Sequence, residues 1–132
     1  MATNILYDRI IYSLRKLIET ATPWKCYDLK PHGAECVVLT PDSATHIATT
    51  TDGTVYRYTI FIDYYSSLSS EGLERLSNNV ADIVDVLNDN THYQPSTSYY
   101  FDGVVENIEY DWGSEDDWKA RITWSGTHEE VA

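Results

Sequence analysis

The sequence predicts a single α+β domain, in which an antiparallel or mixed sheet of about five strands carries two helices packed on one face. The length of 132 residues suits one ordinary domain with one core. Residues 54–65 are rich in β-branched and aromatic side chains that would alternate between two faces, as in a strand. Residues 73–87 repeat apolar side chains every three or four positions, as in a helix. Because a sheet face and an apolar helix stripe bury each other, these two segments should form the centre of the fold.

The first element should be a helix over residues 4–19, capped by Thr3 or Asn4. Its apolar positions recur on one broad face, namely Leu6, Ile10, Ile11, Leu14, Leu17 and Ile18. The helix should end by Thr22, because Pro23 disfavours helical geometry in the preceding residue. An irregular or extended connector is then expected through Lys30.

Residues 35–40 are short, apolar and bounded by Gly33 and Pro41, which predicts a buried strand. We expect a turn or loop at residues 41–43 and a further extended piece at residues 46–51. Asp52-Gly53 favours a type I′ hairpin turn into the long strand that begins at Thr54.

The second helix should follow a polar break at residues 66–70, with Ser69 or Ser70 as its cap. Its predicted apolar stripe consists of Leu73, Leu76, Val80, Ile83, Val84 and Leu87.

The carboxyl-terminal part should form another hairpin around Gly113. Residues 98–101 and 104–110 are predicted to be extended, and residues 111–117 to form a turn. In the last strand, Trp118, Ala120, Ile122 and Trp124 alternate with polar residues. Residues 127–132 are expected to be a frayed tail.

The charge is large and unevenly distributed. The net charge is −12, which argues against general affinity for nucleic acid backbones. Residues 1–30 carry five Lys or Arg against three acids, whereas the remainder carries four bases against 18 acids. Such a separation suits head-to-tail self-association, although a merely solvated charged surface is the equal alternative.

Signatures of a catalytic or metal site are missing from the sequence. The spacing of Cys26 and Cys36 fits no zinc motif, and we expect two buried, reduced thiols. The histidines (His32, His46, His92 and His128) are scattered, and the glycines form no phosphate-binding loop. We therefore expect no cofactor, no metal and no enzyme. Without a leader or a membrane-spanning apolar run, we expect no membrane partner and a protein made in a reducing cytoplasm.

An acidic cluster at the predicted hairpin tip permits two interpretations. Asp111, Glu115, Asp116 and Asp117 lie near Trp112 and Trp118. Carboxylates beside aromatic platforms are typical of sugar sites, but a cluster on a loop stays hydrated, which favours a solvated tip. The many tyrosines, together with Trp112, Trp118 and Trp124, keep open an alternative function as a carbohydrate-binding or small-ligand-binding module.

The order of elements resembles the tail terminator, or tail completion, proteins of long-tailed bacteriophages. The resemblance covers the amino-terminal helix, the Cys36-Val37-Val38-Leu39 strand, the hairpin into residues 55–65, the Leu73 to Leu87 helix and the terminal hairpin ending in Trp118 to Trp124. It covers nearly the full chain as an ordering of elements without a signature motif, and related head-tail connector proteins have neighbouring roles.

The resemblance implies a structural protein of the virion, assembled in the host cytoplasm and placed in the tail-neck region. Such a protein forms a homo-oligomer, a hexameric ring, that caps the tail tube and joins the tail to the head-tail connector protein. DNA would pass through an acidic lumen without specific binding. On this basis we expect Arg9, Arg15 and Lys16 at a subunit interface. Partner contacts are expected from Asp111, Trp112, Glu115, Asp116, Asp117 and Trp118.

Overall fold

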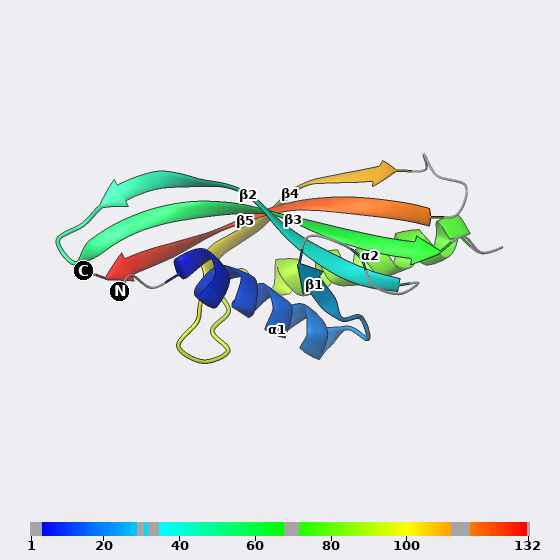
Figure 1. The fold of residues 1–132 in the computed structure, drawn as a ribbon, viewed down its shortest axis with the longest axis horizontal. Coiled ribbons are helices and arrows are strands. Elements are labelled where there is room, and N and C mark those ends of the chain that lie inside the picture. The colour runs from blue at the N-terminus through cyan, green and yellow to red at the C-terminus, as the bar shows by residue number, and fades with distance from the viewer. Residues whose placement is uncertain (1–3, 29–30, 32–34, 68–71, 112–116, 132) are drawn as a thin grey trace.

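The computed structural model describes residues 4–28, 31, 35–67, 72–111 and 117–131. Within these residues the chain forms a π-helical turn, two α-helices and a five-stranded mixed sheet, which confirms the predicted α+β class. In chain order these are η1 (Leu6–Ile11), α1 (Tyr12–Ala21), β1 (Cys26–Asp28), β2 (Glu35–Thr49), β3 (Gly53–Ser67), α2 (Gly72–Asp89), β4 (Phe101–Asp111) and β5 (Asp117–Val131). The strand order is β1-β2-β3-β5-β4 (Figure 1).

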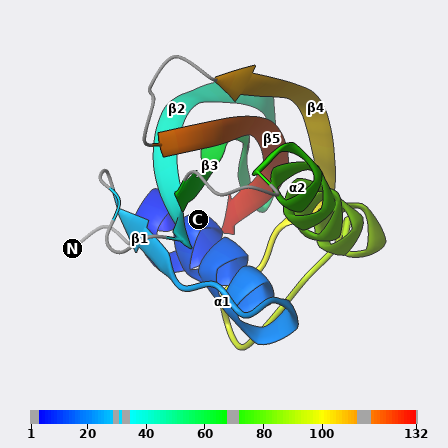
Figure 2. The ribbon, with the colours of Figure 1, turned by 90° about the vertical axis from the view of Figure 1, so that its right-hand side faces the viewer.

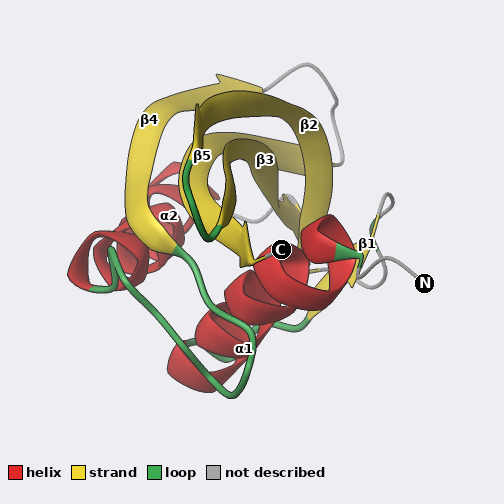
Figure 3. Cartoon of the chain, turned by 90° about the vertical axis from the view of Figure 1, so that its left-hand side faces the viewer, coloured by secondary structure: helices red, strands yellow, loops and turns green. Residues whose placement is uncertain are grey.

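Both helices lie against the same face of the sheet, as predicted (Figures 2 and 3). α1 lies on the β1 and β2 side, and α2 lies on the β4 side. The core between sheet and helices is apolar and includes Ile10, Leu14, Ile18, Leu39, Ile60, Ile62, Leu76, Ile83, Ile122 and Trp124. We call the sheet face that packs against the two helices the helix face.

The amino-terminal helix begins and ends close to its predicted bounds. The Asn4 side chain accepts a hydrogen bond from the Tyr7 backbone N–H at 3.1 Å, as expected of a capping residue. The π-helical turn η1 widens the first turns, and the adjacent residues Ile10 and Ile11 are both buried. The helix ends before Pro23, with the Thr22 N–H on the Ile18 carbonyl.

The connector after this helix contains a strand that the prediction did not specify. β1 pairs in parallel with β2, Cys26 opposite Val37 and Asp28 opposite Leu39. The Glu19 carboxylate accepts the Cys26 backbone N–H at 2.9 Å, which joins α1 to β1. Burial, together with the charge of Glu19, raises the pKa of the Cys26 thiol to about 12, so this thiol stays protonated. Cys26 and Cys36 are both buried and free, as predicted.

The predicted turn at residues 41–43 is wrong, because β2 runs without a break from Glu35 to Thr49. A β-bulge between Pro41 and Ser43 takes up the extra residue, Asp42, while the flanking residues stay paired with β3. Proline and a polar pair resemble a turn in sequence, but a bulged strand at a sheet edge accommodates them equally well.

The hairpin between β2 and β3 is confirmed, but its turn differs from the prediction. The Thr50 N–H donates to the Gly53 carbonyl at 2.7 Å, which centres the turn on Thr51 and Asp52. A type I′ turn needs positive φ at both central residues. Among the described non-glycine residues only Asp102 has positive φ, so the turn is not of that type.

Helix α2 buries most of its predicted stripe. Leu76, Val80, Ile83 and Leu87 are fully buried, whereas Leu73 is 62% exposed and does not belong to the core. The predicted caps Ser69 and Ser70 lie outside the described residues.

The expected frayed tail is also corrected, because β5 continues to Val131 and pairs along its length with β3. Thr127 and His128 are buried. The carbonyl of Tyr99 lies 3.0 Å from Nδ1 of His128, and the Tyr99 hydroxyl donates to the Glu129 carbonyl. The segment before β4 therefore covers a stretch that looked like a polar terminus in the sequence.

One carboxylate joins the sheet to α2 and to the segment before β1. Glu35 Oε2 accepts hydrogen bonds from Trp24 Nε1 and from the Tyr64 hydroxyl, both at 3.0 Å, and Arg75 of α2 forms an ion pair with Oε1. Asn79 of α2 in turn donates to the Tyr64 hydroxyl at 2.8 Å. Burial alone would raise the pKa of Glu35, but these hydrogen bonds and the charge of Arg75 outweigh it and lower the pKa.

We expect Leu76→Ala to lower the free energy of unfolding by about 2–5 kcal/mol, because it leaves a cavity under the sheet. Leu73→Ala removes the same atoms from an exposed position and should change the free energy of unfolding by less than about 0.5 kcal/mol. Urea unfolding of both variants measures the difference. Equal losses would contradict the placement of α2.

We expect Glu35→Gln to be less stable than the wild type at neutral pH. The lowered pKa means that the carboxylate stabilises the fold above its unfolded-state pKa, near 4.5, and that this contribution is lost as the pH falls. The difference in unfolding free energy between variant and wild type should therefore shrink in acid. Ser43→Ala, on the exposed part of β2, changes no titratable group and is the control, so its difference from the wild type should not vary with pH. A difference that stays constant with pH would contradict the role assigned to Glu35.

Candidate interaction surfaces

The outer side of β2 is largely uncovered. β1 pairs with Val37, Val38 and Leu39, and beyond Leu39 this side of β2 pairs with no strand that the structure describes. Residues 41–47 are exposed on both faces, including Ile47, which is 53% exposed. In Figure 1 this part of the β2–β3 hairpin projects past the start of the amino-terminal helix. We call residues 40–49 the open β2 edge.

The register shows which backbone groups point away from the sheet at this edge. The Val37 N–H donates to Lys25 on the β1 side, and the Thr50 N–H donates to Gly53 on the β3 side. Between these two residues the backbone groups of β2 point alternately toward β3 and away from it, and each bulge adds one residue to the count. The backbone groups of Pro41, Ala44 and His46 therefore point outward, away from β3. Pro41 has no N–H, so its outward position costs no hydrogen bond within the sheet. The first outward N–H on the open β2 edge is that of Ala44.

The open β2 edge carries features that discourage indiscriminate strand pairing. Pro41 removes one donor, and bulges lie between Pro41 and Ser43 and between His46 and Ala48. Proline and bulges at an edge strand are known means of limiting aggregation. An edge that is long and exposed, yet irregular, is suited to a partner of matching shape.

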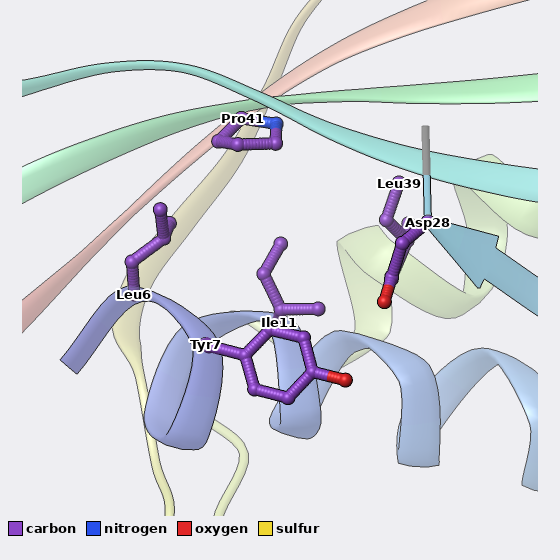
Figure 4. A pocket seen from close by; sticks show the side chains of 6 residues that line it. All are labelled: Leu6, Tyr7, Ile11, Asp28, Leu39 and Pro41. Carbon is purple, nitrogen blue, oxygen red and sulfur yellow. The ribbon is translucent and has the colours of Figure 1, made fainter. Parts of the chain in front are cut away.

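An apolar hollow of about 250 Å³ lies beneath the start of the open β2 edge (Figure 4). Leu6, Tyr7 and Ile11 line it from the helix side, and Leu39 and Pro41 line it from β2. Asp28, at the end of β1, lies at its margin. The hollow therefore begins where β1 stops covering β2, on the helix face of the sheet.

The predicted interface cations have different environments. Arg15 forms an ion pair with Asp28 of β1 at 2.5 Å. Burial alone would lower the pKa of Arg15, but the hydrogen bond and charge of Asp28 outweigh it and raise the pKa. Lys16 is exposed and lies over the Tyr12 ring, 5.6 Å from its centroid, and Arg9 is half-buried. Arg15 is therefore held by a contact within its own chain, and the subunit interface expected at Arg9, Arg15 and Lys16 stays a prediction.

The predicted acidic tip is only partly described. Trp112, Glu115 and Asp116 lie outside the described residues, and the structure gives only the backbone of Asp117 and Trp118, at the start of β5. Asp111 is exposed at the end of β4, opposite Lys119 in the β4–β5 ladder.

A shallow polar hollow of about 260 Å³ at this end of the sheet is lined by Glu109, Tyr110, Asp111, Lys119 and Arg121. It mixes both signs of charge, unlike the convergent carboxyl pair of a glycosidase site. Trp124, which was named for the alternative ligand-binding function, is fully buried and cannot stack on a ligand.

The side of the domain formed by α2 and β4 is acidic. These two elements carry eight acids and one base, Arg75. On the outer side of β4 the Gly103 N–H donates to the Thr91 carbonyl at 2.8 Å, but from Val104 onward this side pairs with no described strand. This part of β4 is a second uncovered edge, at the far end of the sheet from β2. The acids of the two elements are Glu74, Asp82, Asp85, Asp89, Asp102, Glu106, Glu109 and Asp111.

The sequence did not show which strands carry these uncovered edges. Local patterns identify strands but do not give their order, and the order decides which strands lie at the edges. Pro41 within an otherwise extended stretch was the available signal, since proline in a sheet favours an edge.

Within the described residues, no helix has the length and apolar character needed to span a membrane. No group of three or more His, Cys, Asp or Glu side chains among them is arranged to hold a metal ion.

Comparisons with known proteins find a similar fold but no family. No family model matches the chain, and no curated protein matches it. The chain is similar in structure to a chain from the virion of a native gene transfer agent particle, with a TM-score of 0.63 and 17% sequence identity. The similarity covers 96% of this chain and 90% of the other. At this identity the likeness shows a shared fold.

Proposed function

We propose that this protein is a structural, non-enzymatic component of a phage-like particle. In this role it forms a hexameric ring that caps the tail tube, stops tube growth and joins the tail to the head-tail connector protein. The observation that carries the proposal is the pair of uncovered sheet edges on opposite sides of one small domain. The likeness over nearly the whole chain to a protein of a gene transfer agent virion supports it.

Uncovered edges at opposite ends of the sheet favour a head-to-tail contact, which uses two different patches of each subunit and can close into a ring. The charge separation agrees, because η1 and α1 carry more bases than acids while α2 and β4 carry a large excess of acids. In the proposed ring, Arg9 and Lys16 of one subunit lie near the acids of the next.

The proposed position is the tail-neck region of the virion, after assembly in the host cytoplasm. A net charge of −12 suits a lumen through which DNA passes, because an acidic wall repels the phosphate backbone. Residues 111–118, beyond the end of β4 and into β5, are the proposed contact with the tail tube or connector.

The first test is the mass of the assembly, measured by light scattering coupled to size exclusion. We expect a ring for the wild type and a weaker ring for the double variant Arg9→Glu, Lys16→Glu. Exposed ion pairs contribute about 0.2–1 kcal/mol each, so reversing two charges should raise the dissociation constant roughly ten-fold. High salt should weaken the wild-type ring in the same direction.

The matched control is the charge-preserving double variant Arg9→Lys, Lys16→Arg, which should assemble like the wild type. A wild-type chain that stays monomeric at high concentration, even with tail tube protein added, would count against the proposed function.

The second test removes residues 113–116. We expect the variant to keep its ring and to lose capping, so that tubes grow past their normal length in electron micrographs. A replacement of the same residues by a neutral Gly-Ser-Gly-Ser segment keeps the length and separates charge from loop length. Normal capping by the deletion variant would refute the assignment of this contact.

A further inference from the structure

We propose that the open β2 edge binds strand β4 of a second copy of this chain, so that the sheets of neighbouring subunits become continuous. This inference rests on the proposed head-to-tail ring and names the contact that builds it. Residues 40–49 of one copy would pair with residues 104–111 of the next. The apolar hollow beneath Pro41 would receive side chains of the incoming strand.

The strand directions support this pairing. β2, β3, β5 and β4 are consecutive neighbours and each pair is antiparallel, so β2 and β4 of one chain run in opposite directions. A second copy placed by a modest rotation, as in a ring, brings its β4 beside β2 in antiparallel orientation. This is the arrangement in which backbone hydrogen bonds lie perpendicular to the strands.

The outward backbone groups and the side chains of both edges also match. In the β4–β5 register, the backbone groups of Val105, Ile108 and Tyr110 point away from β5. Their side chains lie on the helix face, because their partners in β5 are Trp124, Ile122 and Ala120. The outward residues Pro41 and Ala44 of β2 share that face, opposite Ile60 and Tyr58. Val105 and Ile108 are partly buried against the core of their own subunit, and pairing would place the surface that they leave exposed beside the hollow lined by Leu6, Tyr7 and Ile11.

The charges favour pairing of β2 with β4 over pairing of two β4 edges with each other. β4 carries the acids Asp102, Glu106, Glu109 and Asp111, so two β4 edges would oppose like charges. The open β2 edge carries one acid, Asp42, and the cations Arg9 and Lys16 belong to the neighbouring η1 and α1.

The test is Ala44→Pro, which removes the outward N–H of Ala44 while leaving the ladder with β3 intact. Proline also prevents close approach of an added strand. We expect a folded monomer, with the subunit dissociation constant raised about ten-fold or more. Ala44→Thr keeps the N–H and suits a strand, so it should form the wild-type ring.

Hydrogen exchange of the wild-type ring is the second measurement, and it decides the matter if Ala44→Pro does not fold. Amides in residues 40–49 and in residues 104–111 should both gain protection on assembly. A wild-type ring that forms without this protection, or an Ala44→Pro variant that forms the same ring, would overturn the β2–β4 contact and leave the proposed function standing. A dimer with only the β2 segment protected would also overturn it, in favour of β2–β2 pairing.

Discussion

The carboxylate of Glu35 is the contact on which the arrangement of layers depends. It lies at the first residue of β2 and binds Trp24, Tyr64 and Arg75 together, so it joins the segment before β1, the central strand and α2. Trp24 packs edge-on against Tyr64, with ring centroids 5.1 Å apart. These contacts hold α2 and the segment before β1 near the first residue of β2. The other end of β2, from Pro41 onward, extends beyond that anchored region and stays exposed.

Much of the fold follows from local patterns, as the helices and the last strand show. Leu76, Val80, Ile83 and Leu87 recur with helical spacing and are buried, and Ala120, Ile122 and Trp124 alternate and face the core. Patterns failed where tertiary context decides. Pro41 looked like a turn because a bulge at a sheet edge has no sequence signature of its own. Residues 127–131 looked like a frayed end because the segment around Tyr99 that covers them lies about 30 residues away in sequence.

The interaction surfaces were predictable only in part, for similar reasons. The excess of acids in the later part of the chain was visible in the sequence, and the structure assigns much of it to α2 and β4. The role of Arg15 was not visible, because its partner Asp28 belongs to a strand that composition did not reveal. The sequence also did not show that Gly126 packs closely against Trp124. A Cβ added at Gly126 would lie 2.2 Å from the indole ring, so glycine is needed there.

The antiparallel order of β2, β3, β5 and β4 has a consequence for growth. If β4 of each arriving subunit adds to the β2 edge of the last one, the assembly exposes a new β2 edge identical to the one just used. Such an addition has no chemical end point, and only geometry can stop it. The subunit number is then set by the angle between successive sheets, which the twist of the strands and the bulges beside Pro41 and His46 help to define. A substitution that alters a bulge without weakening the contact should change the number of subunits, since affinity and closure are separate properties of the same edge.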